Sequence, residues 1–190
     1  MVGEDFPLTS KKGEPRDGEP NCIETASSKA TGYTFFEFMM DKGNNNYGEA
    51  LFLLAPGFEA STFTYCLDRM REAGIAVSVI GLTTGLVKSS HGLSVRPDYS
   101  LAQVDYKKVP RLIIIPDGQK STPSLLADPR VHILLEKTLE KNGFIAAMAT
   151  AESQFRRAGI PQPSFFSQFI TQGDSTINHY TAKLIDLLAN

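Results

Sequence analysis

Short apolar runs that alternate with amphipathic segments constrain the fold of this chain more than any other feature. Residues 50–55 and 112–115 are continuous apolar stretches, as expected of strands covered on both faces. Segments with helical periodicity lie between such runs, and short loops join them. This alternation predicts an α/β fold, a three-layer α/β/α sandwich of the flavodoxin-like type with a mostly parallel sheet. The expected strands are 50–55, 75–80, 112–115, 144–149 and one within 165–172, and the expected helices are 61–73, 128–142 and 176–188.

Turn and capping residues indicate where some of these elements begin. Asp128 followed by Pro129 has the order expected at a helix start, with the N-cap first and proline at the first helical position. Residues 87–98 predict two strands around a turn at His91, which is a β-hairpin. Residues 151–158 predict a single helical turn.

Composition argues against several classes of function. The chain has 190 residues, a net charge of −2 and no basic stripe, which disfavours a nucleic-acid partner. No apolar run approaches the roughly 20 residues that cross a bilayer, and the first 20 residues have no apolar signal core. The two cysteines, Cys22 and Cys66, suit neither a disulfide framework nor a metal site. We therefore expect a soluble protein of the cytoplasm or another intracellular compartment, with no membrane span, metal or cofactor.

Residues 1–48 are expected to form an N-terminal arm, and residues 49–190 the α/β domain. The first 32 residues hold few large apolar side chains, too few to offset the entropy of ordering them. Residues 33–40, in contrast, are mostly aromatic or Met. They either add a strand or short helix to the domain's own core or anchor the chain to a protein partner. The residues of such an anchor are Tyr33, Phe35, Phe36, Phe38, Met39 and Met40.

Residues 143–150, with the sequence GFIAAMAT, predict a buried strand that runs into a sharp turn. Many α/β enzymes mount a nucleophile on a turn of this kind. The turn residue here is Ala149, whose methyl group has no nucleophilic atom. The chain therefore has the frame of a catalytic site without its usual reactive group.

Five segments, in the right order, resemble the ThiJ/PfpI family of the class I glutamine-amidotransferase-like superfamily. They are the opening strand and helix LLAPGFE and LDRMREAG, the hairpin VKSSHGLSVRPD, the strand and turn LIIIPDG, the elbow strand FIAAMA and the closing segment ITQGDS. Together they cover about residues 49–190. The resemblance implies the flavodoxin-like fold, and it implies hydrolase, glyoxalase-like or deglycase-like chemistry for members that keep the nucleophile.

This chain departs from the family pattern at the positions that carry the chemistry. The resemblance places the family's nucleophilic cysteine at Ala149 and the acidic residue that activates it at or near Thr62, while Glu59 matches a neighbouring position. Thr150 stands where some members have a histidine. Of the family's Pro-Gly-Gly turn, which contributes to an oxyanion pocket, only Gly118 remains as a glycine. The fold is also shortened after the elbow, and the region 151–169 contains no histidine.

Other side chains near the turn are candidate substitutes for the missing nucleophile. A hydroxyl nucleophile at Thr150 or Ser153 would need a base within hydrogen-bond reach, and His179 is a candidate for that role. His91, in the predicted hairpin, could reach these hydroxyls as a base only in an unusual geometry. Glu152 is more simply explained by a helix cap or a salt link. These patterns assign no catalytic residue.

Three functions are therefore compatible with the sequence. The first is a catalytically inactive domain that serves as a structural or accessory subunit, docked to a protein through the arm or paired as a homodimer. The second is a divergent hydrolase, glyoxalase-like or deglycase-like stress enzyme with a displaced nucleophile. The third is a pseudoenzyme that senses a ligand.

Overall fold

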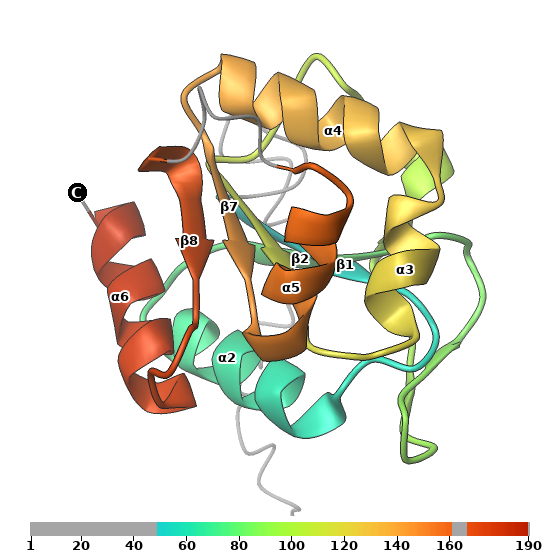
Figure 1. Ribbon diagram of the computed structural model, residues 1–190, viewed down its shortest axis with the longest axis horizontal. Coiled ribbons are helices and arrows are strands. Elements are labelled where there is room, and N and C mark those ends of the chain that lie inside the picture. Colours follow the sequence, from blue (N-terminus) through green and yellow to red (C-terminus); the bar gives the residue numbers. More distant parts are fainter. Residues whose placement is uncertain (1–48, 161–166, 190) are drawn as a thin grey trace, which may run out of the picture. The chain divides into compact units, whose positions relative to one another are not determined.

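The computed structural model describes residues 49–160 and 167–189, so the expected arm and its aromatic segment lie outside the described residues. Figure 1 shows the arrangement of the elements. In chain order they are β1 (Ala50–Leu54), α2 (Ala60–Glu72), β2 (Val77–Gly81), β3 (Val87–Lys88), β4 (Ser94–Val95), β5 (Tyr99–Ser100), the 3₁₀ turn η1 (Leu101–Gln103), β6 (Leu112–Ile115), α3 (Ser121–Leu126), α4 (Pro129–Glu140), β7 (Phe144–Ala147), α5 (Ala149–Arg157), β8 (Phe169–Thr171) and α6 (Ile177–Ala189).

A parallel sheet forms the centre of the domain. Over the described ranges it has six strands in the order β5-β2-β1-β6-β7-β8, and each neighbouring pair is parallel. Phe52 of β1 pairs with Val79 on one side and Ile114 on the other. The chain winds from β1 to one edge and then returns to β6 and the other edge. The winding direction thus reverses between β1 and β6, and ligands bind such sheets in the crevice beyond the carboxyl ends of the strands at this point.

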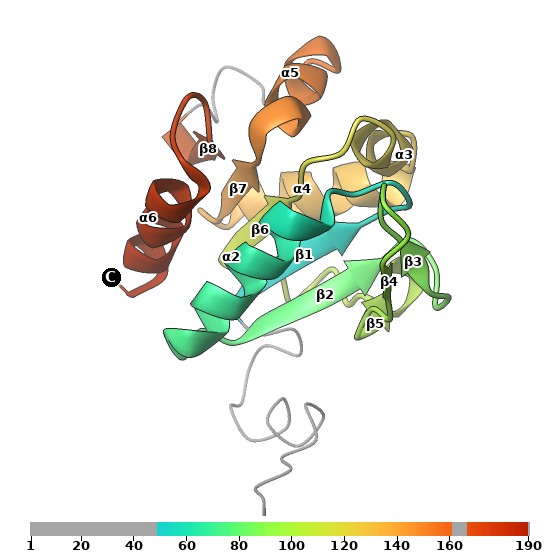
Figure 2. The same cartoon turned by 90° about the horizontal axis from the view of Figure 1, so that it is seen from below.

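Helices cover both faces of the sheet, which confirms the three-layer prediction. Helices α2 and α6 lie on one face, and α3, α4 and α5 on the other (Figures 1 and 2). Phe63 of α2 and Leu184 of α6 pack against the first face, and Leu134 of α4 and Phe155 of α5 against the second. The two central strands, β1 and β6, are buried along their whole length, as their unbroken apolar runs require.

Two local predictions are confirmed closely. Asp128 caps α4, because its Oδ1 accepts a hydrogen bond from the Arg130 amide at 2.9 Å, and Pro129 follows as the first helical residue. Strands β3 and β4 form the predicted hairpin, an antiparallel pair in which Val87 faces Val95. Within the described ranges, 49–160 and 167–189, no helix is both long enough and apolar enough to cross a bilayer.

Several predicted boundaries differ from the structure. The strand expected over 144–149 ends at Ala147, and Ala149 is already the first residue of α5, which is longer than the single turn expected. The strand expected over 75–80 begins at Val77. Strand β5 and helix α3 were not predicted, because two residues of strand and six of helix are too short to show a period.

Candidate functional site

The turn from β7 into α5 holds its first helical residue in a strained conformation. Ala149 has φ of +20°, outside the regions that L-residues readily adopt. Hydrogen bonds hold this residue and the one before it. The Met148 amide donates to the Ile115 carbonyl at 3.1 Å, and the Ala149 amide donates to Oε1 of Gln172 at 3.3 Å. Such strain is typical of functional turns, so the elbow geometry is present although its side chain is a methyl group.

A carboxylate lies beside the first turn of α5. Asp117 follows β6, and its Oδ1 accepts hydrogen bonds from the Gly118 amide at 2.8 Å and the Thr150 amide at 3.2 Å. The Thr150 hydroxyl also donates to the same oxygen. A helix N-terminus carries partial positive charge and unpaired amides, which favour a negative group there. Asp117 therefore supplies an anion from within the chain to this end of α5.

The lack of a side chain at Gly118 lets the loop after β6 approach the loop after β1 closely. Gly118 has φ of +152°, and a Cβ placed on it would lie 2.6 Å from the Gly57 carbonyl oxygen and 2.9 Å from Cα of Phe58. Both obstacles are backbone atoms and cannot swing away. The β6–α3 loop can thus pack directly on the β1–α2 loop, which brings the residues of both loops to one place.

A second carboxylate lies on the other side of these loops. Glu59, the residue before α2, accepts hydrogen bonds from Ser61 at 3.1 Å and from Ser90 of the hairpin at 3.0 Å. His91 Nδ1 lies 3.0 Å from Oγ of Ser90 and 3.7 Å from Oε2 of Glu59. The Ser90 hydrogen bond, supported by Ser61 and by the charge of His91, lowers the pKa of Glu59 and so favours the carboxylate.

The backbone of the hairpin is also tied to the β1–α2 loop. The Gly57 amide donates to the Lys88 carbonyl at 2.8 Å, and the Ser90 amide donates to the Phe58 carbonyl at 2.9 Å. These two bonds hold Ser90 within reach of Glu59. The hairpin therefore forms one wall of the site.

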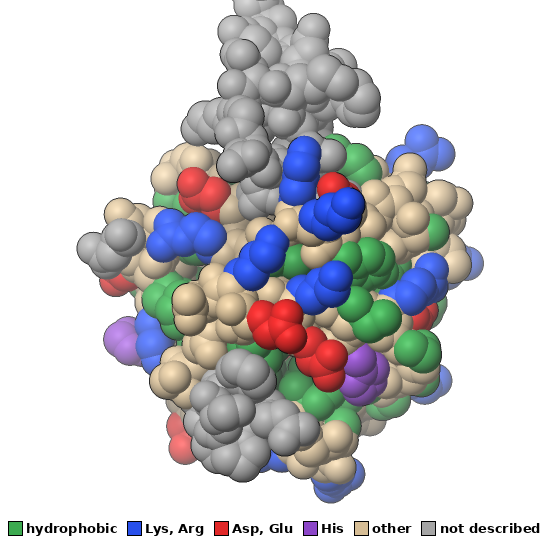
Figure 3. Space-filling model, turned by 90° about the horizontal axis from the view of Figure 1, so that it is seen from above, with side chains coloured by type: hydrophobic (Ala, Val, Ile, Leu, Met, Phe, Trp, Pro, Cys, Tyr) green, Lys and Arg blue, Asp and Glu red, His purple; other side chains and the backbone are tan. Residues whose placement is uncertain are grey.

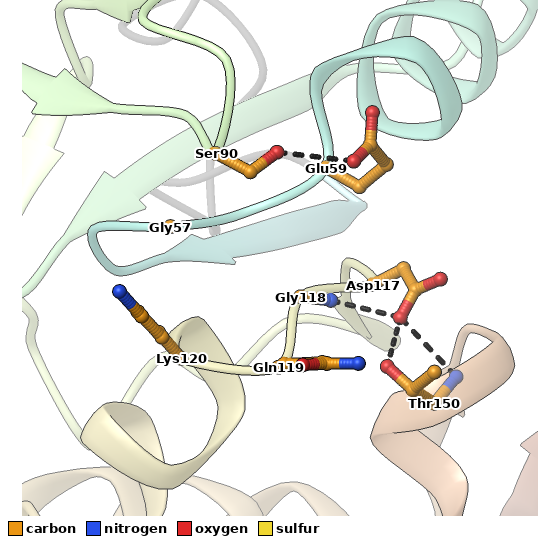
Figure 4. A pocket seen from close by; sticks show the side chains of 8 residues that line it. All are labelled: Gly57, Glu59, Ser90, Asp117, Gly118, Gln119, Lys120 and Thr150. Carbon is orange, nitrogen blue, oxygen red and sulfur yellow. Dashed lines mark hydrogen bonds between the residues drawn. The ribbon is translucent and has the colours of Figure 1, made fainter.

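Between these groups lies a pocket of about 370 Å³ (Figure 4). It sits at the carboxyl ends of β1 and β6, where the winding direction of the sheet reverses. This is the position expected for a ligand site in a fold of this class. The residues that line it are Gly57, Glu59, Ser90, Asp117, Gly118, Gln119, Lys120 and Thr150.

The structure brings some of the sequence-derived site residues together and separates others. Glu59, Gly118 and Thr150 line the pocket, and Ala149 directly precedes Thr150. The hydroxyl of Thr62 donates to the Glu59 carbonyl, at the start of its own helix. The Ser153 hydroxyl likewise donates to the Thr150 carbonyl at 3.0 Å.

The histidine considered as a base for Thr150 or Ser153 is not part of the pocket wall. His179 is exposed in the first turn of α6, and its amide donates to the Thr176 hydroxyl. Glu152 forms an ion pair with Arg156 at 2.8 Å, which agrees with a salt link. Sequence reasoning missed the contributions of Asp117, Ser90, Gln119 and Lys120. The one signal available was the aspartate in place of a glycine after Pro116.

The fold and the position of the site define a flavodoxin-like α/β domain with a strand–turn–helix elbow at its pocket. The chain belongs to the DJ-1/PfpI family, whose model matches residues 48–163. This confirms the resemblance found in the sequence.

Individual relatives agree with this assignment. The chain is 32% identical to protein dj-1beta of Drosophila melanogaster over 133 residues, which are 70% of this chain and 71% of that protein. It is 31% identical to the Parkinson disease protein 7 homolog of Danio rerio over 112 residues, which span 58% of this chain and 59% of that protein.

Solved structures show the same fold. The crystal structure of Drosophila melanogaster DJ-1beta matches with a TM-score of 0.64 and 26% identity, covering 75% of this chain and 91% of that one. Oxidized DJ-1 of Toxoplasma gondii matches with a TM-score of 0.66 and 21% identity over the same shares of the two chains. About a quarter of this chain thus lies outside the shared fold.

Proposed function

We propose that this chain is a non-catalytic DJ-1/PfpI domain that acts as a structural or accessory subunit in a protein assembly. The observation that carries the proposal is the elbow itself. Its turn residue is Ala149, and the adjoining helix N-terminus is occupied by the Asp117 carboxylate. A thiol mechanism requires a thiolate at this turn and an environment that stabilises it. The residues that line this pocket supply no thiol, and the carboxylate of Asp117 beside the elbow would disfavour a thiolate there.

The hydrogen-bond donors of the site support the same conclusion. Attack on a carbonyl produces an oxyanion, and catalysis depends on free donors aimed at that oxygen. The Gly118 and Thr150 amides both donate to Asp117. An oxyanion placed beside them would compete for these donors and face a like charge. The site is therefore poorly suited to acyl or carbonyl chemistry.

The proposed contact with a protein partner rests on the composition of the arm. Burial of aromatic and Met side chains contributes about 25 cal/mol per Å² of apolar surface. The anchor of residues 33–40 would thus stabilise a complex by several kcal/mol before ordering costs. A homodimer is the alternative assembly. We place the protein in the cytoplasm or another intracellular soluble compartment.

A displaced nucleophile is the second candidate, and one contact favours it. The Thr150 hydroxyl donates to a carboxylate, as a hydroxyl nucleophile donates to its base. The accepting oxygen, however, already receives two backbone N–H bonds. A proton taken from Thr150 would have to displace one of them, so this pair is a better structural clasp than a catalytic pair.

Two measurements on the full-length chain test the proposal. The first is the molecular mass by size-exclusion chromatography with light scattering, for the protein in its native extract and for the recombinant protein. We expect a large native complex and a small recombinant species. Replacement of Phe35, Phe36 and Phe38 by serine should abolish rebinding to that complex, whereas the matched change Leu86→Ser, at a leucine that is 62% exposed, should not.

The second measurement is methylglyoxal consumption by the recombinant protein. We expect no turnover above that of heat-killed protein. Turnover that disappears in Thr150→Val would support the displaced-nucleophile alternative. Identical native and recombinant masses would overturn the accessory-subunit proposal.

A further inference from the structure

We propose that the pocket between Glu59 and Asp117 binds a small organic cation, of the amidinium, guanidinium or alkylammonium class. The cation site rests on one part of the proposed function, namely that the pocket carries out no thiol chemistry. The pocket volume of about 370 Å³ falls within the range of small-molecule sites. The charged side chains around that volume, Glu59, Asp117 and Lys120, determine which class of ligand suits it.

The carboxylate of Asp117 has one oxygen available to a ligand. Its Oδ1 is occupied by the Gly118 and Thr150 donors, while no hydrogen bond from the described part of the chain reaches its Oδ2. These contacts fix the carboxylate at the pocket wall (Figure 4). A fixed acceptor of this kind favours a planar or tetrahedral nitrogen cation, because charge-assisted hydrogen bonds are the stronger ones.

Glu59 adds a second negative group to the same pocket. Its side chain is held by Ser61 and Ser90, from two different elements. Because these hydroxyls donate hydrogen bonds to the carboxylate of Glu59, they stabilise its ionised form. Two negative side chains, one from the β1–α2 loop and one from the β6–α3 loop, therefore line one pocket.

Among the described residues that line the pocket, Lys120 is the one with a cationic side chain. Figure 4 shows it extending toward Gly57 and away from Asp117. His91 lies at the rim, where its side chain is 81% exposed, and it carries charge only when protonated. At the Asp117 end of the pocket, no cationic side chain of the lining residues therefore lies against the carboxylate.

Anions have no comparable place in this pocket. The helix N-terminus and the Gly118 amide would otherwise attract a carboxylate or phosphate. Asp117 already uses these donors, and its charge repels a second anion. The same substitution that removes oxyanion stabilisation thus converts the site from one that suits anions to one that suits cations.

Three small molecules of nearly the same shape test this inference, namely acetamidinium, acetamide and acetate. Each is titrated into the full-length ¹⁵N-labelled protein at pH 7 and constant ionic strength, while the amide signals of Gly57, Gly118 and Thr150 are followed. We expect saturable shifts with acetamidinium, binding of acetamide weaker by roughly fivefold or more, and no saturable shifts with acetate.

Two variants show whether the carboxylates are responsible. Asp117→Asn and Glu59→Gln keep side-chain size and should each weaken acetamidinium binding by roughly fivefold. Asp68→Asn removes an exposed carboxylate of α2 that does not line the pocket, and it should leave binding unchanged. Native spectra of the variants establish that they fold, and the two pocket variants are independent of each other.

Acetate binding equal to that of acetamidinium would overturn the inference. So would acetamidinium shifts that are absent from the wild-type protein or unchanged in both pocket variants. These outcomes are separate from the proposed function, which is tested by mass and turnover. A cation site could fail while the accessory role stands, and the reverse also holds.

Discussion

The Thr150 hydroxyl donates a hydrogen bond to the Asp117 carboxylate, which joins the loop after β6 to the first turn of α5. The backbone amide of Thr150 donates to the same oxygen at 3.2 Å. Asp117 thus acts as a cap for α5 from a distant position in the chain, while Met148, the residue before α5, makes no side-chain cap bond. The pocket and the stability of the elbow therefore depend on one side chain.

Asp117→Ala should lower the free energy of unfolding by about 1–2 kcal/mol, the range for loss of a helix cap. Asp117→Asn keeps an acceptor for the two amides and should cost less. Urea unfolding followed by circular dichroism gives both values. Asp68→Asn is the control for the loss of one negative charge, and equal effects of Asp68→Asn and Asp117→Ala would contradict the capping role.

Ala149→Cys tests the electrostatics of the elbow directly. The new thiol would lie at the family's nucleophile position, but next to the Asp117 carboxylate. A nearby negative charge disfavours the thiolate, which is the form that reacts. We expect Ala149→Cys to react with iodoacetamide at pH 7 about tenfold more slowly than Ala149→Cys combined with Asp117→Gly.

One of the two native cysteines, Cys66, provides an internal reference for this measurement. Burial raises the pKa of Cys66 to about 11, so it should stay unmodified while the protein is folded. Mass spectrometry of the digested protein separates its peptide from that of the new cysteine. If the single and double variants reacted at the same rate, Asp117 would not control the potential at the elbow.

Asp98 gives a prediction for the pH dependence of stability. The residue is exposed as a whole, yet its Oδ2 accepts a hydrogen bond from the Val79 amide at 2.8 Å. Partial burial of the carboxylate raises the pKa of Asp98 above its ordinary value of 3.8, although the Val79 bond and Arg71 oppose this. The protonated form is thus favoured in the folded state.

The sign of the effect follows from linkage. A carboxyl group with a raised folded-state pKa stabilises the fold below its unfolded pKa and loses that contribution as the pH rises through the folded pKa. Asp98→Asn keeps an oxygen acceptor for Val79 and has no charge to desolvate. The free energy of unfolding of Asp98→Asn, taken relative to that of the wild type, should therefore be higher at pH 7 than at pH 4. Urea unfolding at both pH values checks this, and Asp174→Asn, at an exposed loop carboxylate, should show no such difference.

The sequence was a good guide where the signal was local. The strand over 112–115 was predicted with its observed bounds, and the start of α4 followed from the Asp128 cap and Pro129. The family resemblance placed Glu59 and Thr150 near the elbow. The partners of these residues were missed, because Ser90 lies 31 positions from Glu59 and Asp117 lies 33 positions from Thr150. No periodicity or spacing encodes contacts that depend on the packing of separate loops.

Gly118→Ala should be the most damaging small substitution in the pocket. Its Cβ would lie 2.6 Å from the Gly57 carbonyl oxygen, and the residue has φ of +152°. Strain and overpacking together should lower the free energy of unfolding by about 2–4 kcal/mol.

Gly92→Ala is the matched control, since Gly92 also has a positive φ, of +89°, but nothing lies within 4 Å of its added Cβ. It should cost about 1 kcal/mol from backbone strain alone. Urea unfolding of the two variants separates backbone strain from steric overlap. Only the close contact of the two loops can account for a larger loss of unfolding free energy at Gly118 than at Gly92. Equal losses would mean that the loops can move apart, and that the carboxylates of Asp117 and Glu59 are not held across a fixed pocket.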